Sequence, residues 1–206
     1  MRQKGILVVV SGFSGVGKGT IMKRLTEKYD NYSLSISATT RAPRVGEVDG
    51  KDYFFHSAEE FQQMIIRDEL VEYACYCGNY YGSPRKYVEE QMDRGKDVIL
   101  EIEIQGALKI KAKYPNALLL FVMPPSGEVL RERLIGRNTE PPEVIDARLK
   151  RASAEADGIE SYDYILVNDV LEKCVDELHS LISCQHRQVS RNLEFINRVR
   201  TQIKEF

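Results

Sequence analysis

The stretch Ile6-Leu7-Val8-Val9-Val10-Ser11-Gly12-Phe13-Ser14-Gly15-Val16-Gly17-Lys18-Gly19-Thr20 decides the fold, because it joins an apolar run to a glycine-spaced turn and then to a helix start. The pattern predicts a strand, a phosphate-binding loop and a helix. Glycines let the backbone turn with its N–H groups inward, where they, the helix N-terminus and the Lys18 ammonium can surround phosphate oxygens. The alternative is a glycine-rich turn with an exposed lysine, which leaves three glycines unexplained.

The composition is that of one domain with insertions. The chain has 206 residues, 43% of them hydrophobic and 29% charged, with a net charge of -2. This balance argues against a general nucleic-acid or membrane surface. The four cysteines lack zinc-site spacing, nothing resembles a secretory leader, and the longest apolar run, 117–123, is too short to cross a bilayer. We therefore expect a cytoplasmic protein with reduced thiols and neither a nucleic-acid nor a membrane partner.

Two kinds of segment follow the loop. Residues 33–83 contain short predicted strands at 33–37, 52–55, 70–76 and 79–82, a polar loop at 38–50 and one helix that begins with a Ser57-to-Glu60 capping box. From residue 84 onward, near-continuous apolar runs at 97–102, 117–123 and 164–167 alternate with helices, as in parallel strands buried on both faces. The first segment is therefore predicted to be an insertion over the main sheet.

Several charged residues are candidates for ligand contact. Glu101 and Glu103 follow a predicted parallel strand, and the carboxyl edge of such a sheet is where ligands bind. Arg41 and Arg44 lie on one loop and can converge on one dianion, although a solvated loop is the alternative.

A second arginine group, Arg133, Arg137 and Arg148, flanks a hinge-like segment. These arginines are either cations that favour a helix C-terminus or part of a lid that reaches transferring phosphates. The tail, 185–206, has helical apolar spacing among arginines and is expected to pack as an amphipathic helix on its own or a neighbouring subunit.

Four motifs carry a family resemblance. They are Ser37-xxx-Arg41-xx-Arg44-x-Gly46-Glu47, Asp52-Tyr53-Phe54-Phe55, Gly78-Asn79-Tyr80-Tyr81-Gly82 and Gln105-Gly106-Ala107, in this order. With the phosphate loop, they resemble bacterial guanylate kinases. The resemblance runs to about Asp169, continues weakly to Cys184 and leaves out the last twenty or so residues.

The resemblance implies an α/β P-loop kinase fold, with a central parallel five-stranded sheet flanked by helices. Within a single domain, 1–206, it implies a core of residues 1–36 and 97–184, a mixed α/β GMP-binding insertion at 37–96 and a short lid at about 137–145. The implied reaction is ATP + GMP = ADP + GDP, with Mg²⁺ entering as MgATP and dGMP as a second acceptor. The expected partners are ATP and GMP, and the expected oligomeric state is a monomer or homodimer.

The resemblance also assigns site residues. Those implied for GMP are Ser37, Arg41, Arg44, Tyr53, Glu72, Tyr81, Ser83 and Glu103, of which Ser37, Glu72 and Ser83 would read guanine. Those implied for ATP are Gly12, Phe13, Ser14, Gly15, Val16, Gly17, Lys18, Gly19, Thr20 and Asn168. The implied catalytic residues are Lys18, Arg44, Arg133, Arg137 and Arg148, and Glu101 would approach the metal through water.

The sequence departs from the family in three places. Phe13 replaces a common proline but keeps every amide donor, and Gly19 replaces the usual Ser/Thr, so the metal is expected to be held mainly by phosphates and water. Glu101 and Glu103 replace aspartates, which leaves open which of the two approaches the metal or GMP. The rival functions are a non-catalytic peptide-binding module, which the intact Lys18 loop disfavours, and a kinase for another nucleoside monophosphate, which Glu72 disfavours.

Overall fold

The computed structural model describes residues 4–76, 78–136 and 142–206. Its central sheet has five strands in the order β2-β7-β1-β8-β9, and all neighbours are parallel. The strands are β1 (Leu7–Gly12), β2 (Tyr32–Leu34), β7 (Asp97–Glu101), β8 (Leu118–Met123) and β9 (Tyr164–Val167). The predicted parallel five-stranded sheet is therefore confirmed.

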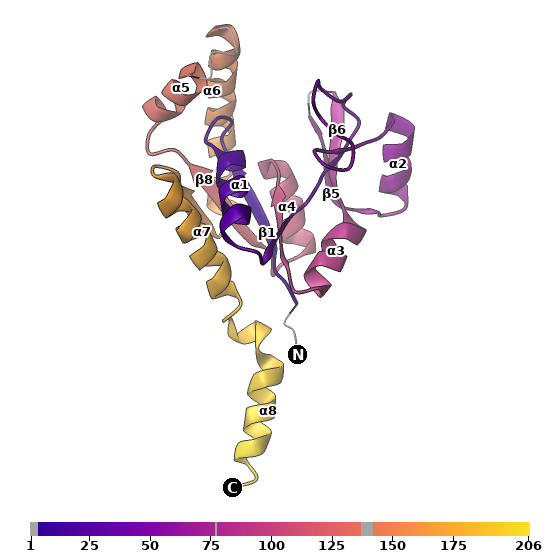
Figure 1. The fold of residues 1–206 in the computed structure, drawn as a ribbon, viewed down its shortest axis with the longest axis vertical. Coiled ribbons are helices and arrows are strands. Elements are labelled where there is room, and N and C mark those ends of the chain that lie inside the picture. Colours follow the sequence, from indigo (N-terminus) through magenta and orange to yellow (C-terminus); the bar gives the residue numbers. More distant parts are fainter. Residues whose placement is uncertain (1–3, 77, 137–141) are drawn as a thin grey trace.

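Helices cover both faces of the central sheet (Figure 1). Val8 and Val10 of β1 pack in one apolar cluster with residues of α1 (Lys18–Lys28), α5 (Gly127–Gly136), α6 (Pro142–Ala156) and α7 (Leu171–Gln185). Leu7 and Val9 face the opposite cluster, which includes residues of α3 (Arg85–Asp93) and α4 (Ile104–Lys113). Because successive strand residues point to opposite faces, a continuous apolar run is the sequence that a doubly covered strand requires.

A second, mixed sheet lies beside the first and has the order β4-β3-β6-β5. Its strands are β3 (Ala38–Thr39), β4 (Phe54–Phe55), β5 (Leu70–Tyr76) and β6 (Asn79–Pro84), and it is accompanied by α2 (Ala58–Ile66). We call residues 38–84 the small-sheet unit. The predicted capping box is present, since Ser57 Oγ accepts from the Glu60 N–H and the Glu60 carboxylate accepts from the Ser57 N–H.

Two predicted boundaries were wrong. The strand expected at 33–37 covers only Tyr32–Leu34, and the loop expected at 38–50 begins with the strand Ala38–Thr39. Ala38 pairs with both Phe54 and Gly82, so the small sheet captures these residues through partners that are distant in sequence. The pairing with distant residues, rather than the local polar sequence, therefore determines that Ala38–Thr39 is a strand.

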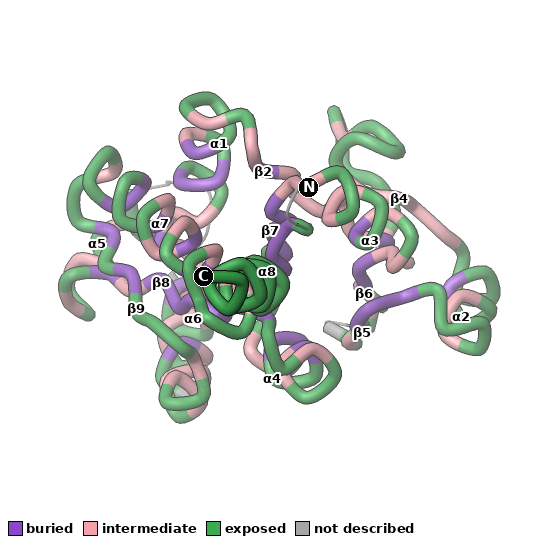
Figure 2. The backbone as a smooth tube through the Cα atoms, turned by 90° about the horizontal axis from the view of Figure 1, so that it is seen from below, coloured by how far each residue is buried: buried purple, intermediate pink, exposed green. Residues whose placement is uncertain are grey.

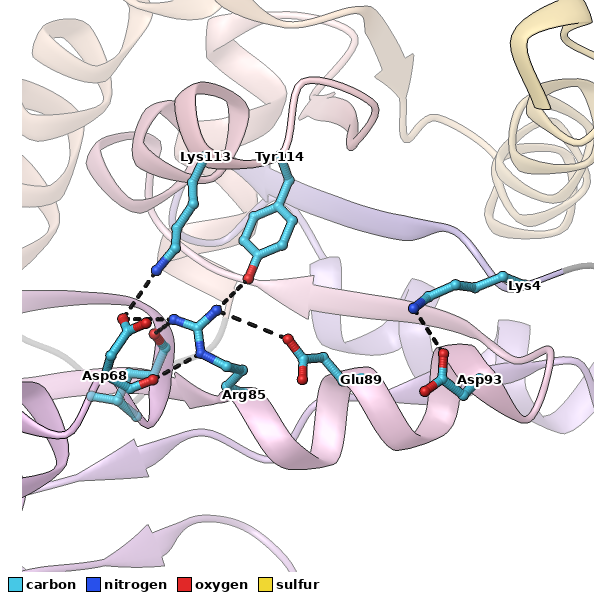
Figure 3. A network of polar contacts seen from close by, with 8 residues as sticks. Lys4, Asp68, Arg85, Glu89, Asp93, Lys113 and Tyr114 are labelled. Carbon is cyan, nitrogen blue, oxygen red and sulfur yellow. Dashed lines mark hydrogen bonds and ion pairs between the residues drawn. The ribbon is translucent and has the colours of Figure 1, made fainter.

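A polar network joins the small-sheet unit to α4 (Figure 3). The Arg85 guanidinium donates to Asp68 Oδ1 and to the Tyr114 hydroxyl, each at 2.7 Å, and to the Leu70 carbonyl at 3.0 Å. Lys113 reaches the same Asp68 oxygen at 3.1 Å. One side chain at the start of α3 thus ties the turn before β5 to the end of α4.

The tail continues from α7 through a short 3-10 helix (Val189–Arg191) into α8 (Leu193–Ile203), which projects away from the body (Figure 1). Its base is docked, because Arg191 donates to the Lys4 carbonyl at 2.9 Å and His186 Nε2 lies 2.9 Å from Asp97 Oδ1. Figure 2 looks along α8 and shows it mostly exposed; Ile196 and Val199 are partly covered, and none of its residues is buried. The expected helix is present, but α8 does not pack on its own chain. No helix of the described residues combines the length and apolar character needed to cross a membrane.

Candidate active site

The phosphate loop connects β1 to α1 at the carboxyl edge of the central sheet. Gly15 and Gly17 have φ values of 89° and 99°, which side chains rarely adopt. A methyl group on Gly15 would lie 2.6 Å from Leu134 Cδ2, so a side chain there would also have to displace Leu134. The Lys18 ammonium donates to the carbonyl oxygens of Gly12 and Phe13 and therefore lies over the loop.

Residues from distant segments close around this loop. The Asn168 amide donates to the Val16 carbonyl at 2.8 Å, and Arg133 donates to the Asn168 carbonyl at 2.9 Å. Arg148 donates to Ser14 Oγ at 3.0 Å. The two arginines thus reach the loop from α5 and α6, Arg133 through the Val16 carbonyl at 3.4 Å and Arg148 through Ser14. Arg137 and the first part of the predicted lid, 137–141, lie outside the described residues.

A cavity of about 320 Å³ lies between the loop and the small-sheet unit. Nine of the residues predicted to contact nucleotide or metal line it: Lys18, Ser37, Arg41, Arg44, Tyr53, Glu72, Tyr81, Glu101 and Glu103. Ser83 is buried directly behind Glu72. Residues that span more than eighty positions in the sequence therefore meet in one place.

The arginine loop is held in shape by Glu47. Arg41 Nη2 donates to both carboxylate oxygens of Glu47, at 2.8 and 2.9 Å, and the Arg44 N–H donates to Glu47 Oε2 at 2.7 Å. The hydrogen bond from Arg41 lowers the pKa of Glu47. The Arg41 guanidinium lies 5.2 Å from the Tyr53 ring centroid, and the Tyr53 and Tyr81 rings are 6.2 Å apart. These side chains provide cationic and hydroxyl donors in the wall of the cavity.

Glu72 also lines the cavity and is only 6% exposed. Its Oε1 accepts a 2.9 Å hydrogen bond from Ser83 Oγ. Burial raises the pKa of Glu72 to about 6, against the lowering effects of the Ser83 hydrogen bond and the Lys109 charge. A buried carboxylate in a cavity wall with one oxygen already satisfied offers acceptor capacity to a ligand with N–H donors.

Glu101 and Glu103 lie at the carboxyl edge of the central sheet, as predicted. Desolvation raises the pKa of both carboxyls, and the Lys18 charge opposes this rise in each case. Glu103 Oε2 also accepts from Arg151 at 3.3 Å, and nearby Glu155 raises the Glu103 pKa further. Glu101 has no such ion pair among the described residues, so its carboxylate faces the cavity beside Lys18.

Sequence reasoning gave no role to several cavity residues. Ala74, Gly82, Ile102 and Gly106 line the cavity, and Glu47 orders its arginine loop. Gly106 and Glu47 belong to the motifs that carry the family resemblance, but no role was predicted for either residue. The alternation of strand side chains would have placed Ala74 on the same face as Glu72.

Comparisons with known proteins agree with this geometry. The family model described as guanylate kinase matches residues 4–185. A guanylate kinase of Halalkalibacterium halodurans is 49% identical over 94% of this chain and 95% of its own length. One of Lactococcus lactis is 48% identical over 94% and 95%. The crystal structure of a guanylate kinase from Anaplasma phagocytophilum is 34% identical and superposes with a TM-score of 0.76 over 95% of this chain and 94% of that one.

Proposed function

The chain belongs to the guanylate kinase family, and we propose that it transfers the terminal phosphoryl group of ATP to GMP, forming ADP and GDP. The observation that carries this proposal is the shared cavity. The Lys18 ammonium of the phosphate loop, the Arg41 and Arg44 guanidinium groups and the buried Glu72 carboxylate line one space of about 320 Å³. Two anion-binding elements and one base-reading acid suit a reaction between two nucleotides.

The GMP site is assigned to the small-sheet side of the cavity. Arg41, Arg44, Tyr53 and Tyr81 would bind the GMP phosphate, because forked guanidinium donors match phosphate oxygens. Glu72, with Ser37 and Ser83, would read guanine. Guanine presents N1–H and an exocyclic amine as adjacent donors on one edge, and an ionised carboxylate can accept both. Adenine has no donor at N1, so AMP would leave the buried carboxylate short of a partner.

The ATP site is assigned to the phosphate loop, residues 12–20, with Asn168 beside it. Backbone N–H groups at the start of α1 would bind phosphate oxygens, and Lys18 would exchange its contacts with Gly12 and Phe13 for ATP phosphates. Phosphoryl transfer needs in-line positioning and neutralisation of charge rather than covalent help. Arg133, Arg137 and Arg148 are assigned to that neutralisation, and closure of the 137–145 segment as a lid would exclude water.

Magnesium fits this site as part of MgATP. Glu101 provides one carboxylate beside Lys18, and Mg²⁺ usually keeps several waters and binds substrate phosphates with one or two carboxylates. When bound, the ion would neutralise phosphate charge. Glu101 would orient one of its waters, while Glu103, already paired with Arg151, would face GMP.

The domain bounds, the location and the oligomeric state are assigned from the same family resemblance. We assign residues 37–96 to a GMP-binding insertion and residues 1–36 and 97–184 to the core. The supply of both nucleotides favours the cytoplasm, and a monomer or homodimer is the expected state.

The proposed function is tested by measuring ADP formation with GMP, dGMP, AMP, CMP, UMP and dTMP as acceptors. We expect turnover with the two guanine nucleotides and discrimination of several orders of magnitude against the others. Glu72→Gln should lower kcat/KM for GMP by roughly ten to a thousandfold, since charge-assisted hydrogen bonds are worth about 1.5 to 3 kcal/mol each. Comparable turnover of AMP by the parent would move the chain to another kinase specificity. No ADP formation with any acceptor would favour a binding module.

A further inference from the structure

Gly106 is a buried cavity residue in the first turn of α4. It belongs to the Gln105-Gly106-Ala107 motif, to which the proposed mechanism gives no role. A methyl group on Gly106 would lie 2.9 Å from Glu72 Oε2 and 3.2 Å from Ile102 Cδ1. A real Cβ atom essentially never lies under 3.0 Å from another heavy atom, so a side chain at position 106 would force the Glu72 carboxylate to shift, and the contact with Ile102 would also be tight.

The backbone does not explain the glycine. Gly106 lies inside a regular helix and is absent from the described residues with positive φ, so alanine could adopt the same conformation. Glycine is a poorer helix former than alanine. Its presence here weakens α4, and the space it leaves for Glu72 is the compensating feature.

Glu72 is thereby held from two sides. Ser83 on β6 donates to Oε1 at 2.9 Å, while Oε2 lies against the first turn of α4. The N-terminal turn of a helix favours a nearby anion. Lys109, three residues after Gly106 on the same helix, donates to the Tyr73 carbonyl at 2.8 Å and lowers the Glu72 pKa. The approach of α4 thus fixes the position of the carboxylate, while the Lys109 charge opposes part of the rise in its pKa that burial causes.

We propose that Gly106 is a positioning residue for base recognition, because its missing side chain lets the Glu72 carboxylate lie against α4 in the orientation that accepts the two donors of guanine. The inference rests on the proposed function, since it assigns Glu72 to the base of GMP. Gly106 acts through Glu72 and supplies no chemical group of its own.

The test is Gly106→Ala, assayed with GMP and ATP varied separately. A displacement of up to about 1 Å in the carboxylate should lower kcat/KM for GMP by roughly ten to a hundredfold. The KM for ATP should stay within about twofold, and Tm should stay within a few degrees of the parent, because the helix propensity of alanine offsets part of the strain at the buried carboxylate. A general structural defect would lower Tm strongly and raise the KM for both substrates. This result would overturn the proposal.

Gly127→Ala is the matched control, because Gly127 also lies in the first turn of a helix and a methyl group there would meet nothing within 4 Å. It should leave both kinetic constants within about twofold of the parent. A second control repeats Gly106→Ala in a Glu72→Ala background, where the loss should shrink to less than about twofold if Gly106 acts through Glu72. An undiminished loss in that background would overturn the proposal.

The two proposals fail differently. A parent that does not phosphorylate GMP would refute the proposed function. A parent that phosphorylates GMP, together with a Gly106→Ala variant of unchanged kcat/KM, would refute only the role of Gly106.

Discussion

The central sheet and the small-sheet unit are stabilised by different means. The central sheet lies between two apolar clusters, and β1 contributes fully buried residues to both. Within the described residues, the separate core of the small-sheet unit has only three buried members, Ala38, Phe61 and Leu70, with Phe54, Met64 and Ile65 partly buried against them. The rest of its support comes from its joint with the core, where Val71 enters a central cluster and Arg85 ties Asp68 to α4. The phosphate loop therefore rests on a rigid sheet, whereas the cavity wall that carries Glu72 depends on a joint.

The largest effects are expected from truncating a buried phenylalanine, and they should differ between the central core and the small-sheet core. Phe121 and Phe61 are both 0% exposed, the first in the central core and the second in the small one. Truncation of a buried Phe to Ala costs about 3 to 5 kcal/mol. Phe121→Ala should lower the free energy of unfolding of the whole chain. Phe61→Ala should open the small-sheet unit first, so that GMP binding is lost while ATP binding persists.

Hydrogen exchange and separate calorimetric titrations with ATP and GMP measure this difference. If Phe61→Ala weakens the binding of ATP and GMP equally, the two regions unfold as one cooperative unit, and the proposed difference in their stability is wrong.

Lys18→Ala tests the opposite side of the cavity. Lys18 belongs to the loop on the central sheet, while the residues assigned to the GMP phosphate and base come from Ser37 to Ser83. Loss of a donor to developing charge typically lowers kcat by about a hundred to a thousandfold. The Kd for GMP should change by less than about twofold. A kinetic loss confined to the KM for GMP would contradict the assignment of Lys18 to ATP.

The sequence was more informative about the central sheet than about the small one, for a physical reason. Long apolar runs such as Leu118–Met123 are specified locally, because both faces of each strand are buried. The two-residue strand Ala38–Thr39 has no local signal and exists through its pairing with Phe54 and Gly82. The resemblance supplied most residues that meet in the cavity, but it could not reveal the approach of Gly106 to Glu72, which depends on how α4 packs against β5.

A smaller effect is expected from pH, with opposite signs for stability and recognition. Burial raises the pKa of Glu72 from 4.5 to about 6, so the native protein binds more protons than the unfolded chain between these values. This carboxyl therefore adds stability as pH falls through about 6, reaching about 2 kcal/mol below pH 4.5. Guanine recognition needs the ionised form, so kcat/KM for GMP at pH 5 should be about tenfold below its value at pH 7.5.

Glu72→Gln provides the control for this profile, because a phosphate on the substrate also titrates near pH 6. The variant should keep the pH dependence of the nucleotides and lose the additional tenfold component. Identical profiles for parent and variant would show that Glu72 does not titrate in this range.

The smallest effect on activity should come from the tail, which belongs to neither sheet. Leu193 and Ile203 of α8 are 50% and 64% exposed, whereas His186 and Arg191 dock its base on Asp97 and on the Gly5 carbonyl, which precedes β1. Truncation after Asn192 removes α8 alone and, at a protein concentration low enough for monomers, should change the free energy of unfolding by less than about 0.5 kcal/mol, with kcat unchanged. Truncation after Cys184 also removes His186 from the buried Asp97 carboxylate, which keeps only the Ile6 N–H and the Asn31 amide as donors, and should cost about 1 to 3 kcal/mol. The chain leaves the apolar stripe of α8 uncovered, so we expect this stripe to pack on a second copy. Sedimentation should therefore show a dimer for the full chain and a monomer for the chain truncated after Asn192. Equal masses for the two chains would contradict this pairing and leave α8 as a solvated appendage.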